Sequence, residues 1–362
     1  MVKSAYIHIP FCKSKCNYCS FVSFPKLELK EHYLVLLSDE IKFHYKGELL
    51  STLYIGGGTP SLLSENEIKE IAEQFNIDNS TEVTVELNPE TITEKYLYNL
   101  KKFGVNRLSF GCQTFDENIL KLIGRRHDSK DVENCVRYAH NVGFKNISLD
   151  FIYGLPEQTC DMFENDLKKA VELDIAHISL YGLKIDDECY FSKHMPKNLP
   201  DEDMQADMYL KAVEILAKNG FEHYEVSNFS KKGYNSRHNL NYWKNSSYYG
   251  FGAGAHGYVD GIRYNNFTTL EKYIKNPTKH QYSHKLSKQE ILEEEIFLGF
   301  RKSDGVDVEK INSKFKIDFD EKYRKILEKY LKSGHLAKTE NGYKLTLNGV
   351  LVSNTILSEF ID

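Results

Sequence analysis

Short runs of apolar, β-branched and aromatic residues alternate with longer amphipathic stretches through the first half of the chain. This alternation is typical of parallel strands connected by helices that pack on the sheet. The six predicted strands are residues 5–9, 52–55, 82–87, 107–110, 147–153 and 177–183. The predicted helices are residues 31–45, 65–75 after Ser64, 94–103, 130–141 after Ser129, and 163–173. Six units instead of the eight of a closed barrel predict an α/β fold, a partial (β/α)6 TIM-like barrel that is open on one side to admit a large ligand.

The pattern changes after residue 183. Residues 184–285 contain a polar, proline-containing stretch, a helix near 204–219 and an aromatic, glycine-rich region at 224–258. Residues 286–362 contain helices followed by an Asn341-Gly342 turn, which predicts a hairpin and a small winged-helix-like α+β domain. We therefore predict a barrel core over 1–183, an extension over 184–285 and a C-terminal domain over 286–362. The C-terminal helices mix both charge signs, which favours structural packing over DNA binding.

Three cysteines lie close together directly after the first predicted strand. Cys12, Cys16 and Cys19 have the spacing C-x3-C-x2-C. Three thiolates on one loop can hold three irons of a [4Fe-4S] cluster and leave the fourth iron open to a small molecule. Zinc is the alternative, but a zinc site normally has a fourth Cys or His at a matching spacing. Phe21 stands where a nearby fourth cysteine could have been. The remaining four cysteines are scattered singly. This is typical of buried free thiols in a protein from a reducing compartment.

The overall composition excludes several classes of function. Lys and Arg number 47 against 52 Asp and Glu, which gives a net charge of −5. No long basic run is present, so nothing indicates nucleic-acid binding. The N-terminus has no long apolar segment, and no stretch approaches the roughly 18 apolar residues that a membrane span needs. We therefore expect a cytoplasmic protein without a transmembrane segment.

Polar or glycine-rich residues follow the predicted strands, at the edge that forms the active face of a βα barrel. Gly56-Gly57-Gly58-Thr59 could let a ligand's amine or carboxylate approach the backbone, although a tight strand-to-helix turn explains the same sequence. Glu86 and Asp150 could accept hydrogen bonds from ribose hydroxyls or an ammonium group, or could cap the next helix. Gln113 and Arg125 could add an amide and a carboxylate-binding fork.

Together these motifs resemble a known family. The cysteine motif, GGGTP, VELNPE, RLSFGCQTF, GRRH and DFIYGLPEQT occur in the order seen in radical S-adenosylmethionine proteins of the oxygen-independent coproporphyrinogen III oxidase group. The resemblance extends from Tyr6 into the C-terminal domain. It implies a partial barrel of the radical SAM type, a [4Fe-4S] cluster on Cys12, Cys16 and Cys19, and S-adenosylmethionine on its open iron. The residues that the resemblance places around S-adenosylmethionine are Tyr6, Gly57, Gly58, Thr59, Glu86, Gln113, Arg125 and Asp150.

Two departures from the oxidase pattern favour another branch of this group. The oxidases resemble C-x3-C-x2-C-x-C, whereas Phe21 occupies the fourth cysteine position here, and only eleven residues precede Cys12. Both features are similar to the HemW heme chaperones. The run Arg237 to Trp243 contains the HNxxYW motif associated with that branch. Imidazole is a common ligand of heme iron, so His238 is the candidate heme ligand, although a structural histidine is the alternative and His256 is a rival.

The resemblance implies a heme-trafficking protein. We expect it to bind heme and pass it to an unidentified acceptor protein, with transient contact to a membrane-bound acceptor possible. The cluster and S-adenosylmethionine would have a regulatory or handover role. The alternative function is the oxidative decarboxylation of coproporphyrinogen III, and the two departures disfavour it. Whether the protein is an enzyme stays open at this point.

Overall fold

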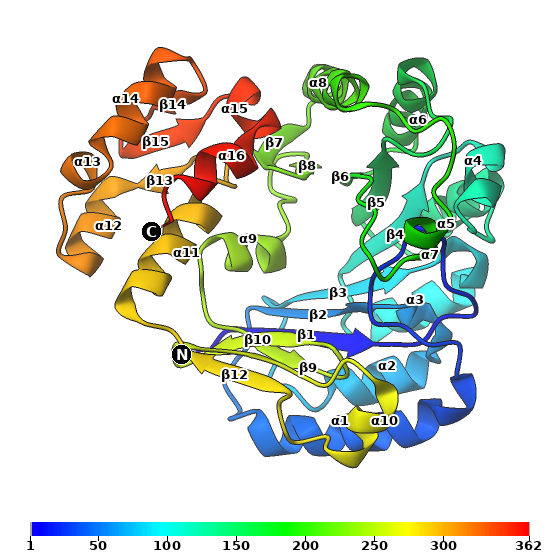
Figure 1. Cartoon of the computed structure of the whole chain (residues 1–362). Coiled ribbons are helices and arrows are strands. Elements are labelled where there is room, and N and C mark those ends of the chain that lie inside the picture. Colours follow the sequence, from blue (N-terminus) through cyan, green and yellow to red (C-terminus); the bar gives the residue numbers. More distant parts are fainter. Residues whose placement is uncertain (1, 362) are drawn as a thin grey trace.

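The computed structural model describes residues 2–361, and its largest element is a curved sheet with helices on its outer side (Figure 1). The six predicted strands lie side by side in chain order, each parallel to the next: β1 (Ser4–Ile9), β2 (Thr52–Gly57), β3 (Glu82–Leu87), β4 (Arg107–Gln113), β5 (Asn146–Tyr153) and β6 (His177–Gly182). The connecting helices are α1 (Lys30–His44), α2 (Glu65–Ala72), α3 (Glu94–Lys102), α4 (Glu117–Leu122), α5 (Ser129–Asn141) and α6 (Cys160–Glu172). The predicted partial (β/α)6 barrel is confirmed.

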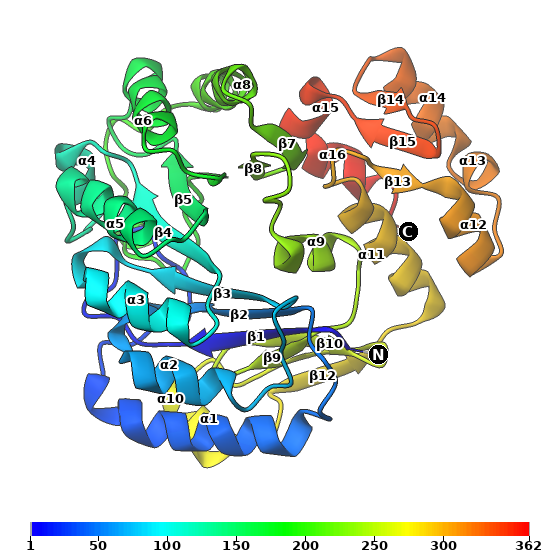
Figure 2. The same cartoon turned by 180° about the vertical axis from the view of Figure 1, so that it is seen from behind.

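Three short strands extend this sheet at its two edges. At one edge β9 (Tyr249–Phe251) pairs in parallel with β1. At the other edge β8 (Asn228–Ser230) pairs antiparallel with β6, and β7 (Glu222–Glu225) pairs with β8. Within residues 2–361 the nine strands run from β7 to β9 without closing, so the barrel stays open on one side (Figure 2). The sequence analysis did not predict these edge strands, because three or four residues are too few to show a period of two.

The strands alternate between an apolar outer face and a polar inner face. Ile7 and Ile9 of β1 are fully buried in the main core beneath the helices. Tyr6 and His8 alternate with these two residues along the strand and therefore face the inside of the barrel. The parallel register brings the corresponding residues of the other strands to the same inner face. These residues are Tyr54, Thr84, Glu86, Arg107, Ser109, Ser148 and Asp150.

Side-chain caps fix where the helices begin. Ser64 caps α2 in a reciprocal capping box with Glu67, as the sequence predicted. The sequence predicted that α5 begins after Ser129, but Ser129 is already the first helical residue. Asp128 is the cap, and its carboxylate accepts the backbone N–H of Asp131. Asp and Ser are both good caps, so the sequence alone did not distinguish the two neighbouring positions.

The extension adds helices and a three-stranded sheet around the open side of the barrel. Its elements are α7 (Tyr190–Lys193), α8 (Glu202–Lys218), α9 (Arg237–Trp243), β10 (His256–Val259), β11 (Ile262–Asn265), α10 (Leu270–Lys275) and β12 (Tyr282–Lys285). Glu40 of α1 ties this region to the barrel. It is buried, and it accepts hydrogen bonds from Tyr273 Oη at 2.6 Å, Asn266 Nδ2 at 2.6 Å and the Gly252 N–H at 2.9 Å.

The C-terminal region has a hydrophobic core of its own, formed by residues from Leu292 to Phe360. Its elements are α11 (Lys288–Gly299), β13 (Val306–Asp307), α12 (Val308–Phe315), α13 (Phe319–Lys322), α14 (Arg324–Lys332), β14 (Leu336–Lys338), β15 (Gly342–Leu345), α15 (Leu347–Leu351) and α16 (Ser353–Ser358). β14 and β15 form the predicted hairpin, with Glu340 and Asn341 in its turn and Gly342 as the first residue of β15. The boundaries at residues 183 and 285 stay predictions.

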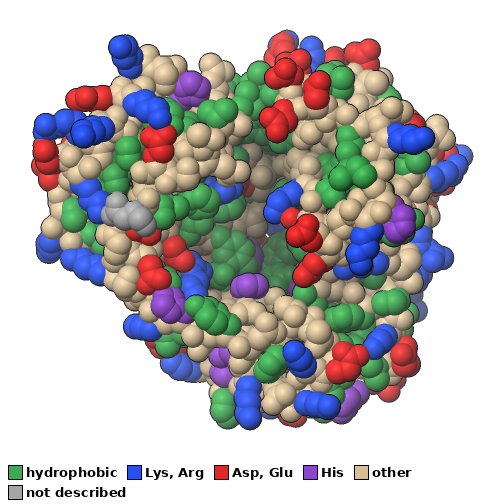
Figure 3. Space-filling view, in the orientation of Figure 1, with side chains coloured by type: hydrophobic (Ala, Val, Ile, Leu, Met, Phe, Trp, Pro, Cys, Tyr) green, Lys and Arg blue, Asp and Glu red, His purple; other side chains and the backbone are tan. Residues whose placement is uncertain are grey.

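Three short 3-10 helices complete the chain, at Leu27–Leu29, Pro60–Leu62 and Pro89–Thr91. In the face of the molecule shown in Figure 3, the surface is hollowed near its centre, and apolar side chains are visible in the hollow. Across residues 2–361, each helix is too short or too polar to cross a membrane.

Candidate functional site

The loop after β1 brings the three motif cysteines to the carboxyl edge of the sheet. Cys12, Cys16 and Cys19 are free thiols of intermediate exposure. The loop is anchored at both ends, because Phe24 donates its N–H to the Pro10 carbonyl at 2.7 Å and Cys12 donates to Phe24 at 3.2 Å. Within residues 2–361, no three His, Cys, Asp or Glu side chains are grouped as ligands for a single metal ion. The cluster prediction therefore rests on the spacing of the thiols and on the surroundings of the loop.

Those surroundings fit a sulfur-ligated group. Burial raises the pKa of the Cys12 thiol and raises the pKa of Cys19 to about 11, so bound metal would have to displace protons there. Thr59 directs its hydroxyl at Cys12 Sγ at 3.5 Å. A Cβ on Gly58 would come within 3.0 Å of the same sulfur and 2.7 Å of the Phe11 carbonyl oxygen. Glycine at position 58 therefore leaves room beside the first thiol that any larger residue would occupy.

Arg125 connects the cysteine loop to the ends of two strands. Its Nη1 donates to Cys16 Sγ at 3.7 Å, and its Nη2 donates to the Gly111 carbonyl at 2.7 Å and to Asn88 Oδ1 at 3.0 Å. Arg126 is exposed. Arg125 thus contacts both the cysteine loop and the strand ends, and Asn88, directly after β3, orients it.

Gly57 and Glu86 lie together at the ends of β2 and β3. The Gly57 N–H donates to Glu86 Oε2 at 3.0 Å, and Tyr54 donates its hydroxyl to Oε1 at 2.7 Å. Gly57 has a φ of 118°, and a Cβ there would come within 2.7 Å of the His8 ring, so only glycine fits. Burial raises the pKa of Glu86 to about 7, although both hydrogen bonds oppose the rise. Glu86 can therefore gain or lose a proton near neutral pH.

Gln113 is the last residue of β4, and Asp150 lies inside β5, three residues before the end of that strand. Ser109 donates its hydroxyl to both oxygens of Asp150 at 3.1 Å. Burial raises the pKa of this carboxyl, and hydrogen bonds from Ser179, Ser109 and neighbouring groups oppose the rise. Gln113 lies at an irregularity where β4 pairs with β5 and has a φ of 69°, which turns its side chain out of the regular strand direction. Gln113 thus lies on the predicted edge of the sheet, whereas Asp150 faces the inside of the barrel.

Tyr6 is hydrogen-bonded to His8, a residue that the sequence analysis did not identify. Its hydroxyl lies 2.9 Å from His8 Nδ1, and His8 Nε2 lies 2.7 Å from the Val22 carbonyl oxygen. Burial lowers the pKa of His8 to about 4, so the ring is neutral at physiological pH. Nε2 must carry the proton, because a carbonyl only accepts, and Tyr6 therefore donates to Nδ1. These two hydrogen bonds connect β1 to the cysteine loop. The alternation of polar and apolar residues in the first strand was the signal that could have revealed His8.

His238 lies on α9 at the amino ends of β2 and β3, where its backbone N–H donates to Glu82 Oε1 at 3.0 Å. Its Nδ1 is 2.9 Å from Thr52 Oγ1 and its Nε2 is 2.8 Å from Tyr242 Oη, while the side chain stacks on Tyr54 with a 4.9 Å separation of ring centroids. Only 1% of the residue is exposed, and burial lowers its pKa to about 3. Heme ligation by His238 stays a prediction, and it would require the loss of one of these hydrogen bonds.

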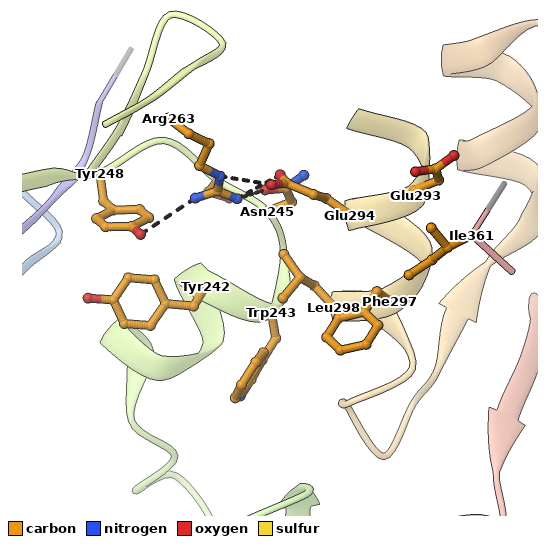
Figure 4. A pocket seen from close by; sticks show the side chains of 11 residues that line it. Tyr242, Trp243, Asn245, Tyr248, Arg263, Glu293, Glu294, Phe297, Leu298 and Ile361 are labelled. Atoms are coloured by element: carbon orange, nitrogen blue, oxygen red, sulfur yellow. Dashed lines mark hydrogen bonds and ion pairs between the residues drawn. The ribbon is translucent and has the colours of Figure 1, made fainter. Parts of the chain in front are cut away.

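A separate pocket of about 570 Å³ lies between α9, β11 and α11 (Figure 4). Arg263 crosses it and forms a two-point ion pair with Glu294, with Nε–Oε1 at 3.0 Å and Nη2–Oε2 at 2.7 Å. The pocket is mostly aromatic and apolar, and a volume of this size suits an organic ligand, since such sites span about 300–1,000 Å³. The residues that line it are Tyr242, Trp243, Asn245, Ser246, Tyr248, Arg263, Glu293, Glu294, Phe297, Leu298 and Ile361. The HNxxYW motif pointed to two of them, and no sequence pattern indicated that α11 would lie opposite.

The sequence matches the radical SAM superfamily over residues 6–170 and the HemN C-terminal domain over residues 286–352. It is 40% identical to heme chaperone HemW of Lactococcus lactis subsp. lactis (strain IL1403), over 99% of this chain and 97% of that protein. It is 38% identical to heme chaperone HemW of Bacillus subtilis (strain 168), over 99% of both chains.

Among solved structures, the fold is similar to that of coproporphyrinogen III oxidase (HemN) from Escherichia coli. The TM-score is 0.87 with 22% sequence identity, over 99% of this chain and 90% of that one. At this level of identity the likeness concerns the fold alone. The curated relatives match over nearly their whole length and at much higher identity. The chain therefore belongs to the HemN/HemW family of radical SAM proteins.

Proposed function

We propose that this protein is a heme chaperone, which binds heme and transfers it to an acceptor protein in the cytoplasm. Relatives that are 40% and 38% identical over 99% of the chain bear the name heme chaperone HemW. The single observation that carries the proposal in this molecule is the aromatic pocket between α9 and α11, which has a volume of about 570 Å³. Tyr242 and Trp243 of the HNxxYW motif line it, so the motif and the pocket coincide.

We also propose that the loop after β1 holds a [4Fe-4S] cluster on Cys12, Cys16 and Cys19. S-adenosylmethionine would lie against the strand ends, and when bound with a reduced cluster it supplies radical chemistry. Arg125 keeps a positive charge beside Cys16, and Gly57 and Gly58 leave the backbone accessible. The residues proposed to surround S-adenosylmethionine are Tyr6, Gly57, Gly58, Thr59, Glu86, Gln113, Arg125 and Asp150.

This cofactor site would have a regulatory or handover role in heme transfer. His238 and Tyr242 connect the two regions, because His238 stacks on Tyr54 while its Nε2 meets the Tyr242 hydroxyl at 2.8 Å. Tyr54 in turn donates to Glu86. A change at either site therefore has a short, continuous set of contacts through which it can reach the other, and exchange of the proton on Glu86 is one such change.

Coproporphyrinogen III oxidase is the alternative function. The overall fold similarity to HemN is the observation in its favour. Against it, Phe21 stands at the position of the fourth oxidase cysteine, and its side chain is 66% exposed beside the cysteine loop. The oxidase therefore remains the second candidate.

One pair of measurements tests the proposal. We expect titration of the purified protein with hemin to give a saturable Soret shift at micromolar protein. We also expect the anaerobically reconstituted protein, given S-adenosylmethionine, a reductant and coproporphyrinogen III, to form no protoporphyrinogen IX. The absence of a Soret shift would refute the chaperone, and formation of protoporphyrinogen IX would establish the oxidase instead.

A further inference from the structure

The pocket between α9 and α11 contains a restricted set of groups that could bind iron. Histidine, cysteine, methionine and tyrosine are the side chains that commonly hold heme iron. Among the described residues that line this pocket, tyrosine is the only one of these types, and it occurs twice, as Tyr242 and Tyr248. His238 does not line the pocket, and hydrogen-bond partners lie at both of its ring nitrogens. A ligand to iron in this pocket is therefore a tyrosine.

Of the two tyrosines, Tyr242 already forms a hydrogen bond outside the pocket. Its hydroxyl lies 2.8 Å from Nε2 of His238, and in Figure 4 it points away from the other labelled residues. The hydroxyl of Tyr248 points instead toward Arg263, inside the group. The two rings pack edge to face, with centroids 4.6 Å apart, so Tyr242 supports the position of Tyr248.

The backbone holds Tyr248 in place. Its N–H donates to the Tyr258 carbonyl at 2.8 Å, and the Tyr258 N–H donates back at 2.9 Å. This two-bond bridge anchors the residue to the start of the three-stranded sheet. Placement on a paired backbone segment gives a ligand a more precise position than a free loop would.

Arg263 places a fixed positive charge beside the hydroxyl. Its Nη1 donates to Tyr248 Oη at 3.5 Å. The guanidinium is held by Glu294, by Asn245 Oδ1 at 2.7 Å, and by the ring of Tyr258 at 4.1 Å. A cation at this distance stabilises a tyrosinate, which is the form of tyrosine that binds ferric iron. Burial raises the pKa of Tyr248, Arg263 opposes that rise, and the carboxylate of Glu294 adds to it.

We propose that ferric heme binds in this pocket with the phenolate oxygen of Tyr248 as an axial ligand of the iron, while Trp243, Phe297 and Leu298 contact the macrocycle. The iron–oxygen bond forms as the phenolic O–H bond breaks and its proton passes to solvent, and no electron is exchanged. The inference rests on the proposed heme-chaperone function and specifies its site.

A redox dependence follows from this ligand. An anionic oxygen is a hard donor and favours Fe³⁺ over the softer Fe²⁺. The protein should therefore hold ferric heme more tightly than ferrous heme, and we expect at least about a tenfold difference in Kd. Reduction of the iron would loosen the heme at the pocket, which suits a protein that must give its cargo away.

The test is a hemin titration of the full chain, followed by visible absorption, resonance Raman and EPR spectroscopy. We expect the wild-type complex to show a phenolate-to-iron charge-transfer band and the vibration of an iron–phenolate bond. Tyr248→Phe should lose both signatures and bind hemin about tenfold or more weakly. Dithionite should weaken heme binding in the wild type, and Tyr248→Phe should remove the difference between the two oxidation states.

Three further variants identify the ligand. Tyr249→Phe is the matched control, because its hydroxyl faces Glu48 outside the pocket, and it should keep both signatures. His238→Gln should also keep them. Tyr242→Phe retains the aromatic ring and should keep them as well. The ligand assignment is overturned if Tyr248→Phe retains the iron–phenolate signatures, or if Tyr242→Phe or His238→Gln loses them.

The outcomes also separate this inference from the proposed function. A wild-type protein that gives no Soret shift with hemin refutes heme binding altogether. A wild-type protein that binds hemin with an imidazole-ligated spectrum, unchanged in Tyr248→Phe, leaves the heme chaperone standing and refutes only the tyrosine ligand.

Discussion

The strand-end site and the pocket between α9 and α11 are built in different ways. Most residues of the strand-end site lie in or directly after neighbouring strands, so the parallel register brings them together, and Arg125 joins them from the loop after α4. The pocket combines a helix near residue 240, a strand near 263 and a helix near 295. The first arrangement is fixed by topology, whereas the second depends on how the C-terminal region packs against the extension. Each site should therefore assemble without the other, so that loss of the cluster leaves the pocket formed and a change in the pocket leaves the cluster bound.

Replacement of the cysteines is expected to give the largest difference between the effects on the two sites. Replacement of Cys12, Cys16 and Cys19 by alanine should abolish iron and sulfide incorporation and the brown absorbance, because no thiolate remains on the loop. Hemin binding at the distant pocket should persist. Iron and sulfide analysis with a hemin titration measures both effects, and Cys160→Ala on α6 is the control that should keep the cluster. Retention of a full cluster in the triple variant would disprove the site.

Arg263→Met changes the pocket and tests whether the cluster site is affected. The variant removes the charge beside Tyr248 and leaves Glu294 without its two-point partner. We expect hemin affinity to fall about tenfold and the free energy of unfolding to fall by ~1–3 kcal/mol, since hydrogen bonds to a charged group are lost. Cluster content should stay at the wild-type level. Arg137→Met, at an exposed position on α5, is the control for loss of an arginine. A parallel loss of cluster would show that the two sites are not independent.

Glu40→Gln probes the connection between the barrel and the extension. The amide can no longer accept all three hydrogen bonds from Tyr273, Asn266 and Gly252, so the free energy of unfolding should fall by ~1–3 kcal/mol. Urea unfolding measures this, and Asp39→Asn, at an exposed neighbouring acid, should change little. Urea unfolding of Glu40→Gln that is unchanged from the wild type would contradict the role of Glu40 in joining the barrel to the extension.

The same carboxyl gives a pH dependence with a defined sign. Burial raises the pKa of Glu40 from 4.5 to about 7 in the folded protein, so the folded state binds the extra proton between these values. Its contribution to stability is complete below pH 4.5 and is lost as the pH rises toward 7. Unfolding titrations from pH 4.5 to 8 should show this decline in the wild type, and a smaller decline in Glu40→Gln. Equal slopes in the two proteins would contradict the assignment.

The smallest effect is expected at Tyr54. Tyr54→Phe removes one hydrogen bond to Glu86 and keeps the ring that stacks on His238. We expect a loss of ~0.5–1.5 kcal/mol in stability and a severalfold weaker affinity for S-adenosylmethionine, measured by calorimetry on the reconstituted protein. Tyr98→Phe, at an exposed tyrosine of α3, is the control. Unchanged affinity would remove Glu86 from the proposed binding set.

The predictability of each part follows from the range of the interactions that form it. The six central strands have four or more residues with a clear pattern, and strand-end residues such as Glu86 and Asp150 follow from that pattern. The edge strand Tyr249–Phe251 is too short to show a period, and its pairing with β1 depends on a contact across about 240 residues. The contacts of His8 with Val22 and of Tyr248 with Arg263 join residues that lie 14 and 15 positions apart, so no local pattern in the sequence indicates them.

The pairing of β1 on both sides has a consequence for the order of events during synthesis. Its first partner, β2, is complete at residue 57, but its second partner, β9, ends at residue 251. A ribosome that adds ~5–20 residues per second needs roughly 10–40 s to make the intervening chain. During that interval one edge of β1, and the cysteine loop that continues from it, lacks its final neighbour. The nascent chain thus exposes the three thiols before the extension covers this edge, which gives an assembly factor a period in which to reach them.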